Sequence, residues 1–295
     1  ISILNENKIF SKEKFFRTVI FKNHLTTVYP LSHAQERLWF IEQYEQGTNA
    51  YHMPMVAELA PGTDRKGIEH ALQEIVKRHH VLRSTIELGD HGKGIQVVHE
   101  SELRIEEAAL SDNDNLDAVL EKDINRPFDL SSQYPIRARF YHIGTDRTVL
   151  SVNTHHIASD GWSSEIFQRE LFAYYKAYAD KDKDFAPTPL EIQYKDYAIW
   201  QRSYLSGDIL EEQLDYWKNK LSGYQTLELP TDRTRPDMVD YKGDHQSFAL
   251  SKDTSGKLRA FAKKHGTTMH TVLLSATNIL SVSYTHLTLP TICSV

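Results

Sequence analysis

The stretch Val149-Leu150-Ser151-Val152-Asn153-Thr154-His155-His156-Ile157-Ala158-Ser159-Asp160-Gly161-Trp162-Ser163 decides how this chain folds. Its first half alternates apolar and polar residues, a pattern that predicts a strand over 148–156. A glycine-containing turn follows, and helical spacing over 163–179 predicts a long helix. The end of a strand is a rigid support, and the turn after it is where side chains can meet a substrate. The strand, turn and helix therefore place a candidate site at the two histidines.

The two histidines and Asp160 have a catalytic and a structural interpretation. An imidazole at a strand end can accept a proton near neutral pH, and the carboxylate of Asp160 could orient the ring or hold the turn. Alternatively, both histidines end a strand and Asp160 caps the next helix. Neighbouring strand residues point to opposite faces, so His155 and His156 cannot easily bind one metal ion, and we expect no metal site. One histidine should face the interior and the other an opening, and nearness to the turn favours His156 as the exposed one.

No nucleophile motif accompanies these histidines. Ser159 and Ser163 flank the turn, but the Gly-x-Ser-x-Gly elbow of serine hydrolases is absent. A glycine-rich loop ending in Gly-Lys-Ser/Thr, which would bind phosphate, is absent as well. A base without a protein nucleophile or a metal suits direct transfer between two substrates. The histidine would help an amine or a hydroxyl attack an activated acyl group.

Composition restricts the class of protein. With 40% hydrophobic and 25% charged residues, the 295-residue chain is typical of a soluble globular protein of two lobes. It has no apolar run of the roughly 20 residues that cross a bilayer, and it does not start like a signal peptide. The net charge of −6 gives no reason to expect nucleic-acid binding. Cys293 is the single cysteine, which excludes internal disulfides and favours the cytoplasm.

Periodicity and turn residues predict a mixture of strands and helices. Ser32 and Gln35 form a capping box that starts the first helix. Further helices are expected at 65–80, 116–124, 163–179, 194–205, 208–221, 254–265 and 271–280. Strands are expected at 53–59, 82–88, 95–99, 136–143, 148–156 and 246–250. The charged, proline-containing stretch 180–189 is the expected boundary between two lobes.

Four segments, in this order, resemble the motifs of the condensation domain of non-ribosomal peptide synthetases. They are SHAQERLWF at 32–40 (SxAQxRLWF), RHHVLRSTI at 78–86 (RHxxLRTxF), HHIASDGWS at 155–163 (HHxxxDG with Trp-Ser) and YKDYAIWQ at 194–201 (YxDYAxWQ). Ser84 before Thr85 is a small departure. HHxxxDG alone is shared with chloramphenicol acetyltransferase and other acyltransferases, whereas four motifs in the family's order are highly specific.

The resemblance implies a fold and a reaction. The fold is α/β, an α+β two-layer sandwich, with two chloramphenicol-acetyltransferase-like lobes in a V-shaped pair and a tunnel between them. An upstream peptidyl carrier protein would bring an acyl or peptidyl thioester on phosphopantetheine, and a downstream carrier an aminoacyl thioester. An adjacent adenylation domain in the parent chain is a further expected partner, with no nucleic acid and no membrane. No cofactor is expected to bind directly, because the substrates are tethered to the carriers. The motif most resembles the subtype that joins two L-residues.

The resemblance also implies roles for single residues. His156 would be catalytic, and the free amine would attack the thioester beside it. His155, Asp160, Gly161 and Arg83 would be structural. Asp160 would pair with an arginine, Arg83 by preference or Arg78, and Gly161 would let the pantetheine approach closely. The substrate arm would pass near Ser159, Trp162 and Ser163.

The same reading predicts how the chain is divided. We expect an N-terminal linker at 1–28, an N-lobe with the active-site motif at 29–185, a partial C-lobe at 186–280, and a tail unrelated to the family at 281–295. The chain starts with Ile1 rather than methionine, so we expect a fragment of a longer protein. The resemblance implies a bridging crossover and a latch strand after Leu280, and because neither is recognisable there we expect a C-terminally truncated second lobe and question the activity of this chain by itself. Two other functions remain open: a stand-alone acyltransferase that uses coenzyme A, and a non-catalytic module that docks carriers.

Overall fold

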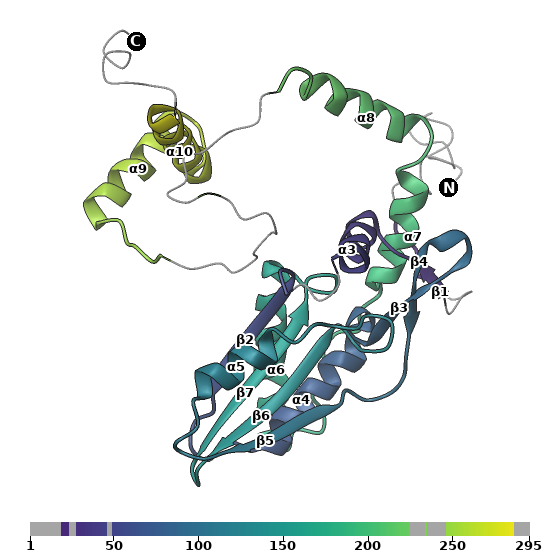
Figure 1. Cartoon of the computed structure of the whole chain (residues 1–295), viewed down its shortest axis with the longest axis vertical. Coiled ribbons are helices and arrows are strands. Elements are labelled where there is room, and N and C mark those ends of the chain that lie inside the picture. Colours follow the sequence, from purple (N-terminus) through teal and green to yellow (C-terminus); the bar gives the residue numbers. More distant parts are fainter. Residues whose placement is uncertain (1–18, 24–27, 46–48, 225–233, 235–245, 286–295) are drawn as a thin grey trace. The chain divides into compact units, whose positions relative to one another are not determined.

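The structure is a computed structural model that describes residues 19–23, 28–45, 49–224, 234 and 246–285 (Figure 1). Most of the predicted linker and most of the predicted tail lie outside these residues, and the proposed divisions of the chain stay predictions. Contacts between Cα atoms divide the chain into two compact units, residues 1–215 and 216–295. Each unit is described by itself.

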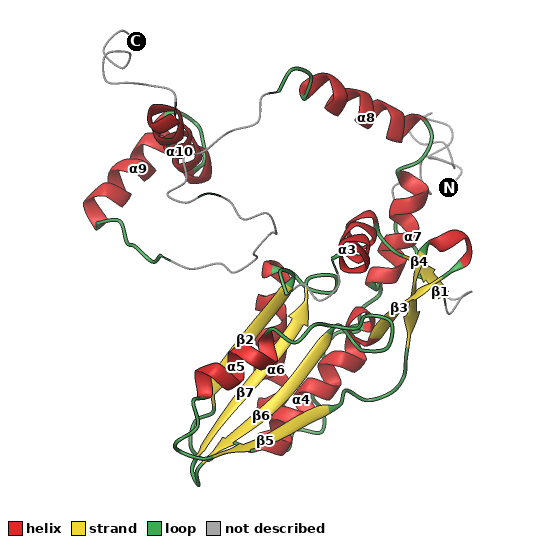
Figure 2. Ribbon diagram, viewed as in Figure 1, coloured by secondary structure: helices red, strands yellow, loops and turns green. Residues whose placement is uncertain are grey.

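The first unit contains two sheets (Figure 2). The larger sheet has the strand order β2 (His52–Glu58), β7 (Arg147–His155), β6 (Ile136–Ile143), β5 (Ile105–Leu110). Its strands pair antiparallel except β5 and β6, which run parallel. The smaller sheet has the order β1 (Val28–Pro30), β4 (Gly94–Val98), β3 (Ser84–Leu88), all antiparallel. The mixed α/β class predicted from the sequence is confirmed.

Helices cover both faces of the larger sheet. On one face, α4 (Arg65–Arg78) and α6 (Gly161–Ala179) bury their apolar sides against strand residues, with Leu72 and Ile75 wholly buried. On the other face, α5 (Leu116–Ile124) packs through Leu120 on alternate residues of β6 and β7. Because side chains alternate along a strand, β7 contributes to both layers and is buried along most of its length. The strand that carries the site is therefore held from two sides.

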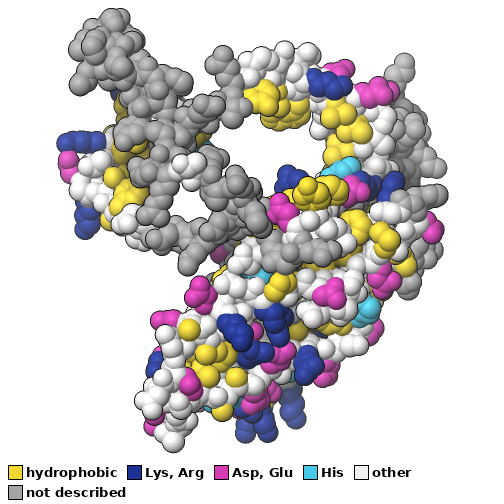
Figure 3. Space-filling view, in the orientation of Figure 1, with side chains coloured by type: hydrophobic (Ala, Val, Ile, Leu, Met, Phe, Trp, Pro, Cys, Tyr) yellow, Lys and Arg dark blue, Asp and Glu magenta, His cyan; other side chains and the backbone are white. Residues whose placement is uncertain are grey.

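Charges over α5 and the neighbouring strands are mixed in sign (Figure 3). Arg139 pairs with Glu106 and lies 3.1 Å from Asp123, and Arg126 lies 3.7 Å from Glu106. Since Arg139 and Arg126 both lie beside carboxylates, the face has no uniform positive potential of the kind that binds phosphate backbones.

The smaller sheet and two helices form the second half of this unit. Helix α3 (His33–Tyr44) begins with the capping box predicted from the sequence: Ser32 accepts from the Gln35 amide, and the Gln35 side chain accepts from the Ser32 amide. Helix α7 (Tyr194–Tyr204) contacts residues 29–33, which run from β1 into the start of α3. Its contacts there are Lys195 Nζ to Tyr29 Oη (2.8 Å), Tyr194 Oη to Ser32 Oγ (2.9 Å), the His33 amide to Gln201 Oε1 (2.9 Å) and Arg202 Nε to the Leu31 carbonyl (2.8 Å).

Several elements differ from the sequence prediction. The expected strand 82–88 starts only at Ser84, because His80–Arg83 form a 3₁₀ turn, η1. Strands β1 and β5 were not predicted: β1 has three residues, and the sequence IEEAAL of β5 contains residues that favour helices. The strand expected at 246–250 is wrong. Those residues are irregular, and every described strand belongs to the first unit.

The second unit is helical where it is described. Helices α9 (Lys252–Lys264) and α10 (Met269–Thr285) contact each other, and α8 (Asp208–Lys220) crosses from the first unit into the second. In the described part of the chain, no helix combines the length and apolar character that spanning a membrane requires. The V-shaped arrangement of lobes and the tunnel between them remain predictions.

Candidate active site

The two histidines lie where β7 ends. His155 is the last residue of the strand, His156 starts the turn, and α6 begins at Gly161. Backbone hydrogen bonds fix this region: the His155 amide donates to the Pro135 carbonyl (2.9 Å), the His156 amide to the Tyr51 carbonyl (2.8 Å) and the Ala158 amide to the His155 carbonyl (3.0 Å). The turn therefore has a defined shape at the end of a central strand of the larger sheet.

His155 is the interior histidine. Its side chain is fully buried, and its Nε2 lies 3.1 Å from Glu42 Oε1 on α3. Its Nδ1 accepts the Ile157 backbone amide at 3.1 Å. The ring also packs edge-on against Phe128, with centroids 5.7 Å apart. Every polar atom of this imidazole thus has a structural partner, which leaves it no access to a substrate.

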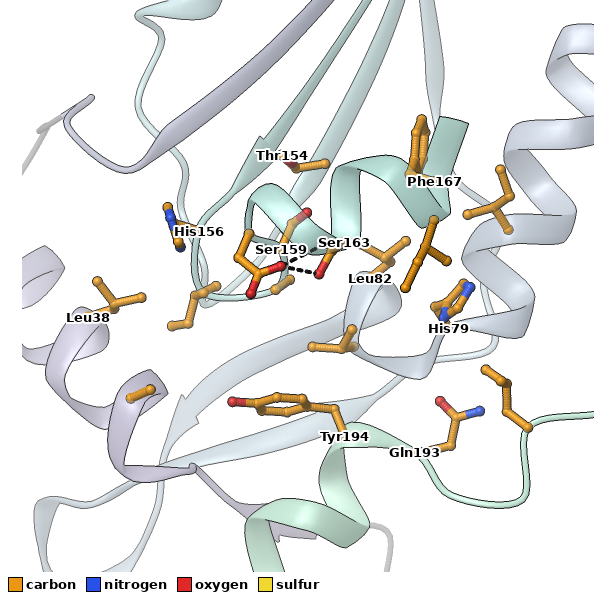
Figure 4. Close-up of a pocket in the computed structure, with 18 of the residues that line it drawn as sticks. Leu38, His79, Leu82, Thr154, His156, Ser159, Ser163, Phe167, Gln193 and Tyr194 are labelled. Atoms are coloured by element: carbon orange, nitrogen blue, oxygen red, sulfur yellow. Dashed lines mark hydrogen bonds between the residues drawn. The ribbon is translucent and has the colours of Figure 1, made fainter. Parts of the chain in front are cut away.

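His156 is the exposed histidine, and it lines a cavity of about 410 Å³ (Figure 4). The strand alternation expected from the sequence thus places the two rings in opposite environments. The cavity wall combines α3, α4, the turn after β7, α6 and the start of α7. Its polar lining includes Arg37, His79, Ser159, Asp160, Ser163, Gln193 and Tyr194, and its apolar lining includes Leu38, Ile75, Leu82, Ile157, Ile166 and Phe167.

Asp160 caps α6. Its Oδ1 accepts from the Ser163 amide at 2.8 Å and from Ser163 Oγ at 2.7 Å, the contacts drawn in Figure 4. These hydrogen bonds from Ser163 hold the pKa of the Asp160 carboxyl below its ordinary value. The carboxylate is therefore favoured in its ionised form at the positive end of the helix.

Among the described residues, Asp160 forms no ion pair with Arg83 or Arg78, which corrects the partners expected from the sequence. Arg83 is buried, donates to the His99 carbonyl and pairs with Glu100 at 2.9 Å. Arg78 pairs with Glu170 at 3.1 Å. Both guanidiniums have other partners, and among the described residues Asp160 satisfies its carboxylate locally through Ser163. Arg83 thus connects the start of β3 to the residues that follow β4, rather than holding the turn.

The remaining predicted residues lie in the turn after β7 and the first turn of α6. A Cβ added to Gly161 would meet no atom of the described residues within 4 Å, and this glycine has no positive φ. Trp162 is 78% exposed, while Ser159 and Ser163 line the cavity. The space beside Gly161 is open, so its lack of a side chain is not required by protein packing.

Sequence reasoning missed several cavity residues. His79 Nε2 donates to Glu170 Oε2 at 2.7 Å, and Gln193 connects the Arg78 carbonyl to the His80 amide. Tyr194 Oη contacts Ser32, and burial raises the pKa of this phenol, which keeps it protonated. Glu42 was missed too, although it follows Gln35 by seven residues, a spacing that places both on one side of a helix. In the described part of the chain, no cluster of three or more His, Cys, Asp or Glu side chains is arranged to hold a metal ion.

A family model and the curated relatives of this chain point to the same protein family. Residues 25–288 match the family model described as "Condensation domain". A linear gramicidin synthase of Brevibacillus parabrevis is 38% identical over 266 residues, which are 87% of this chain and 5% of that protein. Enniatin synthase of Fusarium equiseti is 35% identical over 249 residues, 83% of this chain and 8% of that protein. The chain thus spans less than a tenth of the length of these curated relatives.

Solved structures share the fold. The X-domain in a complex with OxyB from teicoplanin biosynthesis is 27% identical, with a TM-score of 0.79 over 90% of this chain and 59% of that one. The first condensation domain of the calcium-dependent antibiotic synthetase, at 17% identity and a TM-score of 0.68, covers 89% of this chain and 61% of that one.

Proposed function

This chain belongs to the condensation-domain family, whose members form amide bonds in peptide synthetases, and on that premise we propose that it joins two carrier-bound substrates. The donor is an acyl or peptidyl thioester, and the acceptor is the free amine of an aminoacyl thioester. The observation that carries the proposal is the position of His156: an exposed imidazole on a rigid turn, facing a cavity of about 410 Å³.

The reaction is an aminolysis. The acceptor nitrogen attacks the carbonyl carbon of the donor thioester, a C–N bond forms, and the C–S bond breaks. The amine loses one proton and the pantetheine sulfur leaves as a thiolate, which takes up a proton to become a thiol. Because thioester aminolysis is downhill, much of the rate can come from holding both arms in line beside His156.

His156 is the proposed catalytic residue. As a base it would take the proton from the attacking amine and return it to the thiolate. As a positioning group it would accept a hydrogen bond from the neutral amine. As a donor it would stabilise the oxyanion of the tetrahedral intermediate. We further propose that Asp160 acts on the turn by capping α6, and that the pantetheine arm runs past Ser159, Gly161, Trp162 and Ser163.

The finer identity of the reaction follows from the motif. Alanine and serine before Asp160, with Trp162-Ser163 after Gly161, support the subtype that joins two L-residues. We propose peptidyl carrier proteins on both sides and an adenylation domain in the same assembly as partners. Phosphopantetheine enters as part of each substrate. The cytoplasm is the proposed compartment.

The experiment mixes the chain with two carrier proteins, one loaded with an acyl thioester and one with an aminoacyl thioester, and measures the amide product by mass spectrometry. The His156→Ala variant should lose about 10²- to 10⁴-fold in rate, the range for removal of a general base. His142→Ala, half-buried on β6 and outside the cavity, is the matched control and should keep the wild-type rate. An unchanged rate in His156→Ala would show that the assignment of His156 is wrong.

A non-catalytic module that docks carriers is a second candidate, and one observation favours a docking role. A neighbour at 27% identity is an X-domain solved in complex with OxyB. In that case the wild-type chain would bind loaded carriers in a pull-down but give no amide product. Replacing both carriers by acyl-coenzyme A and a free amine tests the stand-alone acyltransferase, which would then form product without any carrier.

A further inference from the structure

We propose that Glu42 is a positioning residue for the condensation reaction: it fixes the tautomer of His155 and, through it, the turn that presents His156. The inference rests on the proposed function for its effect on rate. Glu42 lies on α3, 113 positions before His155, and nothing in the site motif points to it. The buried contacts between this helix and the turn carry the inference.

One side of α3 holds the turn at two points. Gln35, Leu38 and Glu42 are spaced three and four residues apart and share one side of the helix. Gln35 Nε2 lies 3.4 Å from the Ile157 carbonyl, and Leu38 packs in the apolar cluster that includes Ile157. Glu42 reaches His155, whose Nδ1 accepts the Ile157 amide. The residue next to His156 is thus held at its carbonyl directly and at its amide through His155.

The proton on His155 follows from these contacts. A nitrogen that accepts the Ile157 amide hydrogen carries no proton of its own, so Nδ1 is the bare nitrogen of the ring. Nε2 then carries the proton and donates it to Glu42 Oε1. A carboxylate is a pure acceptor, so it favours this tautomer over the reverse one. In the reverse tautomer an Nδ1–H would face the Ile157 N–H, and two donors would meet.

Burial makes this selection strong. The His155 side chain is fully buried, and only 8% of the Glu42 side chain is exposed. If the acceptor were removed, water could not easily replace it, and the Nε2–H would be left without a partner in the interior. The ring could then change its tautomer and release Ile157, which would loosen the turn on which His156 lies. A displacement of about 1 Å at a reacting group can cost on the order of 100-fold in rate.

The test compares three variants on α3. Glu42→Gln keeps an oxygen acceptor in place and removes only the charge. Glu42→Met removes the acceptor at similar volume. Gln43→Met makes a similar chemical change at a neighbouring, solvent-exposed position and serves as the control. Each is measured in the two-carrier assay for kcat and KM, and by NMR with ¹⁵N-labelled histidine for the tautomer of His155 and by amide hydrogen exchange at Ile157.

We expect Glu42→Gln and Gln43→Met to stay within about threefold of the wild-type kcat and to keep the Nε2–H tautomer. Glu42→Met should lose about 10- to 100-fold in kcat with little change in KM for either carrier, lose the single tautomer and exchange the Ile157 amide faster. A Glu42→Met protein with an unchanged tautomer, an unchanged Ile157 exchange rate or an unchanged kcat overturns the proposal.

Two further outcomes are separable. If Glu42→Met does not fold, Glu42→Asp replaces it: this variant keeps the charge but withdraws the acceptor by one methylene, and kcat equal to wild type would refute the positioning role. If the wild-type chain itself makes no amide product, the proposed reaction is wrong, yet the His155 tautomer and the Ile157 exchange still decide whether Glu42 holds the turn.

Discussion

Replacing Asp160 tests whether this carboxylate works as a helix cap or as a partner of an arginine. In the structure it accepts two hydrogen bonds from Ser163, at 2.8 and 2.7 Å, and no arginine contacts it among the described residues. Loss of an N-cap costs about 1 kcal/mol, in a range of roughly 0.5–2. Loss of the negative charge at the positive end of α6 adds about 0.3–1 kcal/mol. Asp160→Ala should therefore lower the free energy of unfolding by about 1–2 kcal/mol.

The Asp160→Asn variant separates the loss of the capping hydrogen bonds from the loss of the negative charge. Its amide oxygen can still accept from Ser163, so Asp160→Asn should lose only the charge term of about 0.3–1 kcal/mol. The assay is urea unfolding followed by circular dichroism at low ionic strength, with both variants and wild type measured in parallel. An ion pair with an arginine would predict that asparagine costs as much as alanine. Equal losses in the two variants would therefore refute the capping argument.

Three further predictions concern other residues. Gly161→Ala should leave the melting temperature unchanged, because the added methyl meets no atom of the described residues within 4 Å. A lower condensation rate at an unchanged melting temperature would show that the substrate arm needs this space, whereas a lower melting temperature would contradict the prediction. Burial lowers the pKa of His80 to about 4, below its unfolded value of 6.5, so the contribution of this residue to folding stability should be fully present above pH 6.5 and be lost as the pH falls toward 4. His80→Asn should make the urea midpoint fall less steeply over this pH range, and a pH dependence equal to that of wild type would contradict the prediction. Leu72→Ala, at a wholly buried site, should cost about 2–5 kcal/mol in urea unfolding, whereas Leu88→Ala, 71% exposed, should stay within about 0.5 kcal/mol.

The sequence predicted the position of the two histidines better than the distant contacts that hold them. Alternation along 148–156 placed one histidine inside and the other in an opening, and the structure has His155 buried and His156 exposed. A strand reverses its side chains at every residue, and the reversal continues to His156, the first residue after β7, whose amide donates to the Tyr51 carbonyl. The capping box at Ser32 was also predictable, since both partners lie within one helical turn.

Contacts between distant residues were beyond the reach of local patterns. Asp160 was expected to meet Arg83, but the serine three residues later satisfies it first, because a local cap orders far fewer residues than a distant ion pair. Glu42 and His155 meet only because α3 packs beside the end of β7, and no spacing in the sequence encodes that distance. Strand β5 was missed for a related reason: its residues favour helices, and its parallel pairing with β6 overrides that preference.

The contacts between α7 and residues 29–33 limit where two condensation domains can be joined into a chimera. Composition suggests a junction in the proline-containing stretch 180–189. A junction there would take residues 29–36 from one parent and α7 from the other, and four hydrogen bonds between these segments would then depend on matching sequences. A junction placed after Tyr204 takes residues 29–36 and α7 from the same parent. The safer point for exchange therefore lies beyond the end of α7 rather than in the stretch that the amino-acid composition indicates.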